Sequence, residues 1–95
     1  MKHIVCFKLI ESSEKEKNAA KDILLSMKGN VPQILDIEVG VDFLGSARSY
    51  DILLQVTLAD RASLEDYQKD LYHCDVVKTY MHAHTASSVA IDYEL

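Results

Sequence analysis

Hydrophobic and polar residues alternate along four stretches of the chain, residues 2–10, 34–43, 49–58 and 86–94. Such alternation is typical of β-strands that have one buried face. In the first stretch, His3 shares a face with Val5, Phe7 and Leu9, so we expect this face to lie on the core side. A histidine there is either a hydrogen-bonded structural residue or a polar residue that lines a pocket and can act as a general base.

Two other stretches repeat their apolar residues every three or four positions, which predicts helices. The first helix is expected to begin at Ser13, because Ser13 and Glu16 have the S-x-x-E spacing of a capping box. Gly29 and Asn30, followed by Pro32, end it. Its lysines are expected to face the solvent: Lys15, Lys17, Lys21 and Lys28.

The second helical stretch begins at Asp60 or Ser63 and loses its periodicity between Tyr72 and Asp75. The apolar spacing resumes at Val76. This pattern predicts a kinked helix, or two short helices, in place of one straight rod.

The predicted order is therefore β-α-β-β-α-β, a ferredoxin-like α+β fold in a single domain of residues 1–95. A turn at 45–47 predicts that the second and third strands form a hairpin. Because both crossovers should be right-handed, both helices are expected on one side of the sheet.

The other face of the sheet is expected to be open and unusually apolar, which favours a homodimer formed through this face. Scattered apolar residues are also normal on protein surfaces, and this alternative stays open. The residues assigned to the open face are Ile4, Cys6, Ile10, Ile34, Leu53 and Ala90, mixed with Asp51, Gln55 and Thr57.

Composition narrows the possible partners. With 15 acidic and 10 basic residues the net charge is −5, which argues against binding to nucleic acid or to an anionic membrane. No apolar run approaches the roughly 20 residues that span a bilayer, and no secretory leader is recognisable. The two cysteines, Cys6 and Cys74, are far apart, so reduced thiols and a cytoplasmic location are expected.

Tyr67 and His73 are the candidate catalytic residues. A straight helix would place them about 120° apart, so they converge only if the helix breaks between them. A tyrosine beside a histidine can polarise a carbonyl group and move a proton. The alternative is that Tyr67 is a core aromatic residue and His73 lies at the surface.

No metal or cofactor is expected. His82 and His84 would diverge on a helix, and neither has an obvious third ligand nearby. Glycine-rich phosphate loops, serine-nucleophile elbows and paired catalytic carboxylates are missing.

Five segments in order resemble the stress-responsive A/B barrel (Dabb) family over nearly the whole chain. They are Lys2–Lys8, Glu38–Gly40, Arg48–Asp51, Tyr67-x5-His73 and Val89–Tyr93. The resemblance implies a ferredoxin-like monomer that forms a dimeric α+β barrel.

Within this family, plant polyketide cyclases such as olivetolic acid cyclase imply catalytic roles for Tyr67 and His73. The expected ligand contacts are His3, Val5, Phe7 and Ile52. Asp70 and Leu71 replace the family's His-Pro pair, Ile52 stands where the cyclases have a pocket histidine, and Leu24 and Leu25 where they have a pocket tyrosine.

Three functions follow as hypotheses. The first is a small cytoplasmic dimeric barrel of unassigned function that binds a small apolar or aromatic molecule between sheet and helices. The second is a cofactor-independent acid–base enzyme, a cyclase, lyase or isomerase, that uses Tyr67 and His73. The third is a structural or chaperone-like assembly protein.

Overall fold

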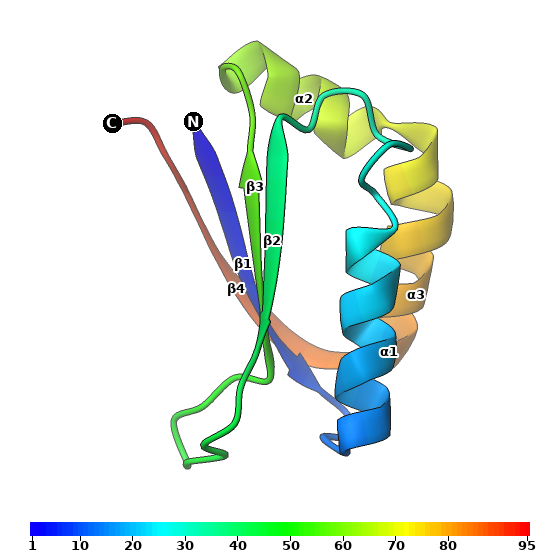
Figure 1. Ribbon diagram of the computed structural model, residues 1–95, viewed down its shortest axis with the longest axis vertical. Coiled ribbons are helices and arrows are strands. Elements are labelled where there is room, and N and C mark those ends of the chain that lie inside the picture. Colours follow the sequence, from blue (N-terminus) through cyan, green and yellow to red (C-terminus); the bar gives the residue numbers. More distant parts are fainter.

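Four strands form one antiparallel sheet in the order β2-β3-β1-β4, and helices cover only one of its faces (Figure 1). The computed structural model describes residues 1–95. The elements are β1 (Lys2–Leu9), α1 (Glu14–Leu25), β2 (Asp36–Val41), β3 (Ile52–Thr57), α2 (Arg61–Lys69), the π-helix η1 (His73–Lys78), α3 (Thr79–His84) and β4 (Thr85–Tyr93). This arrangement confirms the predicted ferredoxin-like α+β fold. No helix has the length and apolar character that crossing a membrane requires.

Both predicted helix starts are confirmed. The Ser13 hydroxyl accepts a hydrogen bond from the Glu16 N–H at 3.2 Å, and the Asp60 carboxylate accepts one from the Ser63 N–H at 2.8 Å. Lys17 differs from the expectation, because it is 8% exposed and its ammonium donates to the Asp42 carbonyl at 3.4 Å. A long aliphatic stem allows a lysine to be buried in this way while its charged end reaches a polar partner.

The register of β1 determines which residues face the helices. His3 lies opposite Val56 on one side and Asp92 on the other, and Val5 lies opposite Leu54 and Ala90. Residues directly opposite one another share a face of the sheet. The helix side therefore carries His3 as predicted, and His3 is 8% exposed.

The expected orientation of β4 is wrong. Ala90 was assigned to the open face, but its pairing with Val5 places it on the helix side. Val89, Ile91 and Tyr93 consequently point away from the helices and are 51%, 60% and 38% exposed. Alternation gives a strand two faces, but only the pairing register decides which face is covered.

Three other residues do not lie on the open face as expected. Ile34 precedes β2 and packs against the core, and Ile10 lies just beyond β1. Asp51 is 6% exposed, and its carboxylate accepts hydrogen bonds from the Leu9 N–H at 2.8 Å and the Ser12 hydroxyl at 3.0 Å. It therefore ties the end of β1 to the start of β3.

The predicted β2–β3 hairpin is confirmed, with shorter strands than expected. Phe43 was assigned to the apolar face of the second strand, but it lies in the connecting loop and is 97% exposed. Gly45 adopts a positive φ of 64° in this loop, a conformation that glycine tolerates without strain.

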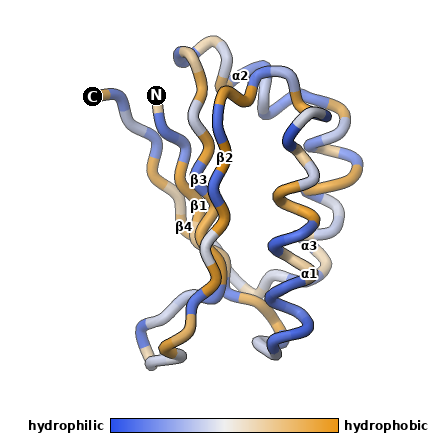
Figure 2. The backbone as a smooth tube through the Cα atoms, viewed as in Figure 1, coloured by the Kyte–Doolittle hydropathy of each residue, from blue (hydrophilic) through white to orange (hydrophobic).

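One surface of the sheet remains uncovered, and we call it the outer face. Apolar and polar residues alternate along the strands that form it (Figure 2). Its apolar residues, by strand pairing, are Ile4, Cys6, Leu53, Val89, Ile91 and Tyr93.

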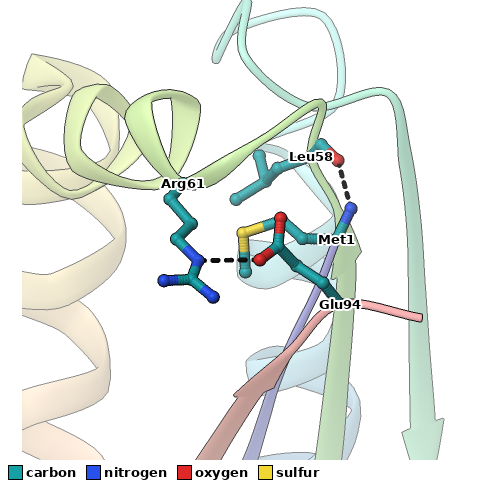
Figure 3. Close-up of polar contacts among 4 residues, drawn as sticks. All are labelled: Met1, Leu58, Arg61 and Glu94. Carbon is teal, nitrogen blue, oxygen red and sulfur yellow. Dashed lines mark hydrogen bonds and ion pairs between the residues drawn. The ribbon is translucent and has the colours of Figure 1, made fainter.

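Both chain ends are held close to the start of α2 (Figure 3). The N-terminal ammonium of Met1 donates to the Leu58 carbonyl at 2.8 Å, and the Arg61 guanidinium pairs with the Glu94 carboxylate at 2.7 Å. The second pair is solvent-exposed, so we expect it to contribute about 1 kcal/mol or less to stability.

Candidate functional site

A cavity of about 520 Å³ lies between the sheet and the helices. Sixteen residues line it, nine of them hydrophobic. The sheet contributes mainly residues of β1 and β4, because α1 packs against β2 and β3 and the core fills that part of the interior. The opposite wall comes from α1, α2, η1 and α3.

Most of the predicted ligand contacts lie on the sheet side of the cavity. His3, Val5 and Phe7 line the cavity. Ile52 does not, although the sequence placed it there. It is 2% exposed within the core, and Leu54, the next inward-facing residue of β3, lines the cavity in its place.

The helix breaks between Tyr67 and His73 as predicted, but at Asp70 and not within the expected segment Tyr72–Asp75, which is helical. The Asp70 backbone ends α2 with ψ of 132°, outside the helical range, and its carboxylate accepts the His73 N–H at 3.0 Å. One residue therefore ends one helix and caps the next helical segment. The break returns His73 to Tyr67, so that their rings stack with centroids 4.3 Å apart.

His73 is held as a neutral base. Its Nδ1 lies 3.0 Å from the Tyr67 carbonyl oxygen, which can only accept, so Nδ1 carries the proton. Burial lowers the pKa of His73, and the charges of Lys78 and His3 act in the same direction, against the hydrogen bond to Tyr67 and the Asp70 carboxylate. Near pH 7 the unprotonated Nε2 can therefore accept a proton.

Tyr67 is held as a neutral donor. It is fully buried, and burial raises the pKa of its phenol far above the ordinary value, with the negative charge of Asp92 adding to the effect. Its hydroxyl contacts only the Met27 sulfur, at 3.7 Å. A thioether is a weak acceptor, so only a weak hydrogen bond holds this hydroxyl.

His3 completes a cluster of three rings. Its ring meets that of Tyr67 edge-on, with centroids 5.5 Å apart, and its Nδ1 donates to the Asp92 carboxylate. This carboxylate fixes the ring orientation of His3 and leaves Nε2 without a protein partner. We call His3, Tyr67 and His73 the ring cluster.

Asp92 was not recognised from the sequence as a site residue. Placing Ala90 on the open face also turned Asp92, two residues further along the same strand, away from the site. The available signal was the position of a lone carboxylate near the end of β4, where antiparallel pairing with β1 brings it opposite His3.

His82 and His84 diverge, as expected for residues on a helix. His82 lines the cavity, whereas His84 donates from Nδ1 to the Tyr80 carbonyl at 2.8 Å and stacks on the Tyr80 ring. The structure contains no group of three or more His, Cys, Asp or Glu residues arranged to hold a metal ion.

Comparison with known proteins places this geometry in context. The family model of the stress-responsive A/B barrel domain (Dabb) matches residues 1–95. No curated protein sequence matches the chain.

Several solved structures share the fold. A dimeric ferredoxin-like protein of unknown function from Bacteroides fragilis aligns with a TM-score of 0.80 and 22% identity, covering 99% of this chain and 94% of its own. A dimeric ferredoxin-like protein of unknown function from Thermobifida fusca aligns with a TM-score of 0.83 and 19% identity, covering 99% of this chain and 89% of its own. The hydroxynitrile lyase of Passiflora edulis aligns with a TM-score of 0.78 and 15% identity, covering 97% of this chain and 89% of its own. Identities this low establish the fold alone.

The state of His73 can be measured by NMR. With ¹⁵N-labelled histidine, we expect the His73 ring to titrate below its ordinary pKa of 6.5 and to carry its neutral-state proton on Nδ1, because burial disfavours the imidazolium. Lys78→Met should raise this pKa, since it removes a nearby positive charge. A titration midpoint at or above 6.5, or an Nε2–H tautomer, would contradict this assignment.

The lowered pKa of His73 also makes the stability of the fold depend on pH. Below pH 6.5 the unfolded chain protonates His73 while the folded protein still holds it neutral. The wild type should therefore lose stability relative to His73→Gln as the pH falls from 7.5 through this window, as measured by urea unfolding.

Proposed function

The chain belongs to the stress-responsive A/B barrel family, and on this premise we propose that it binds a small apolar or aromatic molecule in the cavity between sheet and helices. The observation that carries the proposal is an apolar cavity of about 520 Å³ whose wall includes the whole ring cluster. Small-molecule sites typically enclose roughly 300–1,000 Å³ and combine apolar walls with a few convergent polar groups.

We further propose that residues 1–95 act as one domain and that two copies associate through the outer face. The exposed Val89, Ile91 and Tyr93 support this, because an apolar strip on a sheet without a covering layer favours association. The dimeric state of the Bacteroides and Thermobifida proteins is a second support. The free thiols of Cys6 and Cys74 support a reducing, cytoplasmic location.

Cofactor-independent acid–base catalysis is the second candidate function, favoured by the complementary states of His73 and Tyr67. In the proposed step, His73 Nε2 takes a proton from a carbon next to a carbonyl group. The C–H electron pair forms a carbon–carbon double bond, the π electrons of the carbonyl group move to its oxygen, and the Tyr67 hydroxyl donates a hydrogen bond to the resulting enolate. The proton then returns from His73 to the product. A catalytic role is also supported by the shared fold of the Passiflora edulis hydroxynitrile lyase.

The binding proposal predicts that filling part of the cavity weakens binding. Ala90→Phe places a ring in the space next to Val5 and should weaken binding of the neutral probe 2-naphthylmethanol by about tenfold or more, which corresponds to roughly 1.4 kcal/mol. Calorimetric titration measures the change. Ala62→Phe, on the exposed surface of α2, is the matched control and should bind as the wild type does. Equal binding by all three proteins would refute the proposal.

The dimer proposal predicts a change of mass. Ile91→Lys introduces a charge into the outer face and should convert the protein to a 10.7 kDa particle in light scattering, where the wild type has twice this mass. Leu71→Lys replaces an apolar residue outside the sheet that is at least as exposed as Ile91, and this variant should stay dimeric. If the wild type itself scatters as a 10.7 kDa monomer, the dimer proposal is refuted.

The catalytic proposal predicts accelerated proton exchange at an activated carbon. The probe is 1-phenylbutane-1,3-dione in D₂O, with exchange at its central carbon followed by ¹H NMR. His73→Gln should slow the protein-dependent exchange by about 100-fold or more, the usual contribution of a general base. Tyr67→Phe should slow it less, and His84→Gln should leave it unchanged. No acceleration by the wild type would eliminate this candidate and leave the binding proposal intact.

A further inference from the structure

The charge of the cavity wall is opposite to that of the chain. The protein has 15 acidic and 10 basic residues, yet the wall contains no aspartate or glutamate. It contains Lys78 and three of the four histidines: His3, His73 and His82. The Asp92 carboxylate accepts a hydrogen bond from His3 Nδ1, but Asp92 itself does not line the cavity.

Lys78 and His82 lie one helical turn apart at the mouth of the cavity. Both are exposed, and both also line an adjoining surface groove, which places them where the cavity meets the solvent. The only ion pairs in the structure are His3–Asp92 and Arg61–Glu94, so the ammonium of Lys78 has no carboxylate partner. Lys78 also lines the cavity itself, and its positive charge is one of the smaller causes of the lowered pKa of His73.

A third polar group near the mouth lacks a partner. The Thr85 hydroxyl oxygen is buried without any hydrogen bond, and Thr85 lines the cavity three residues beyond His82. Buried polar atoms are almost always paired in folded proteins. This oxygen is closed off from the cavity as the side chain stands, so the Thr85 side chain must rotate before a ligand oxygen can supply the missing partner.

We propose that the ligand is an apolar or aromatic carboxylic acid whose carboxylate is bound at the mouth by Lys78, His82 and Thr85. His82 lies nine positions beyond His73 along the helical wall, a distance on the order of 10 Å from the rise per residue. The carboxylate therefore lies at the opposite end of the ligand from the ring cluster. A single ammonium beside a histidine and a hydroxyl matches a monoanion.

This inference rests on the proposed binding function and deepens it by naming the ligand class. The test compares two probes with the same ring system, 2-naphthoate and 2-naphthylmethanol, by calorimetric titration at low salt. The wild type should bind 2-naphthoate about five- to tenfold more tightly, a preference typical of a partly exposed charge pair. Adding 0.5 M NaCl should reduce the preference because salt screens exposed charges.

Substitutions at the mouth test whether Lys78 and Thr85 cause the preference for 2-naphthoate over 2-naphthylmethanol. Lys78→Met should reduce this preference to about twofold or less, because it removes the ammonium that distinguishes the carboxylate from the alcohol. Thr85→Val keeps the side-chain shape and should weaken 2-naphthoate binding selectively. Lys15→Met, an exposed lysine on α1 outside the cavity, is the matched control and should retain the full preference.

The outcomes separate this inference from the proposed function. If the wild type binds both probes equally, or if Lys78→Met and Thr85→Val both keep the preference, the carboxylate assignment is overturned and the binding function stands. If the wild type binds neither probe, the binding function fails and the ligand class fails with it.

Discussion

The register of β1 is the constraint on which the rest of the structure depends. As a central strand, β1 pairs with β3 on one side and β4 on the other, and these pairings place His3 between Val56 and Asp92. A shift of one residue would move every side chain of β1 to the other face. The same register therefore produces two features: an inner face with His3 backed by a carboxylate, and an outer face with exposed apolar residues on β4.

The break at Asp70 has a comparable effect on the helical layer. Without it, Tyr67 and His73 would project about 120° apart. With it, Asp70 ends α2 and caps the next segment, and His73 returns to the Tyr67 backbone and ring. The π-helix that follows is a rare conformation, most often found at functional sites. The helix is therefore interrupted at the point where the interruption lets the ring of Tyr67, a hydrogen-bond donor, stack on the ring of His73, a proton acceptor.

The sequence was sufficient for the element order, the two helix N-caps, the existence of a break in the second helix and the position of His3, because each depends on local spacing or on one strand's alternation. It was insufficient where a second strand decides the outcome. Alternation alone could not show that Ala90 and Asp92 face inward, or that Leu54 and not Ile52 reaches the cavity. The burial of Lys17 likewise follows from a tertiary partner, the carbonyl of Asp42, that lies 25 residues away.

Burial divides the cavity into two electrostatic environments. At the ring cluster, Tyr67 is 0% and His3 8% exposed, and ionisation there is costly, so burial favours the neutral forms of Tyr67 and His73. At the mouth, Lys78 and His82 are exposed, and water stabilises an unpaired charge at little cost. An ionised group would lose most of its hydration at the inner end but little at the mouth. A molecule with one apolar end and one acidic end therefore has a single favourable orientation, with its uncharged part presented to the ring cluster.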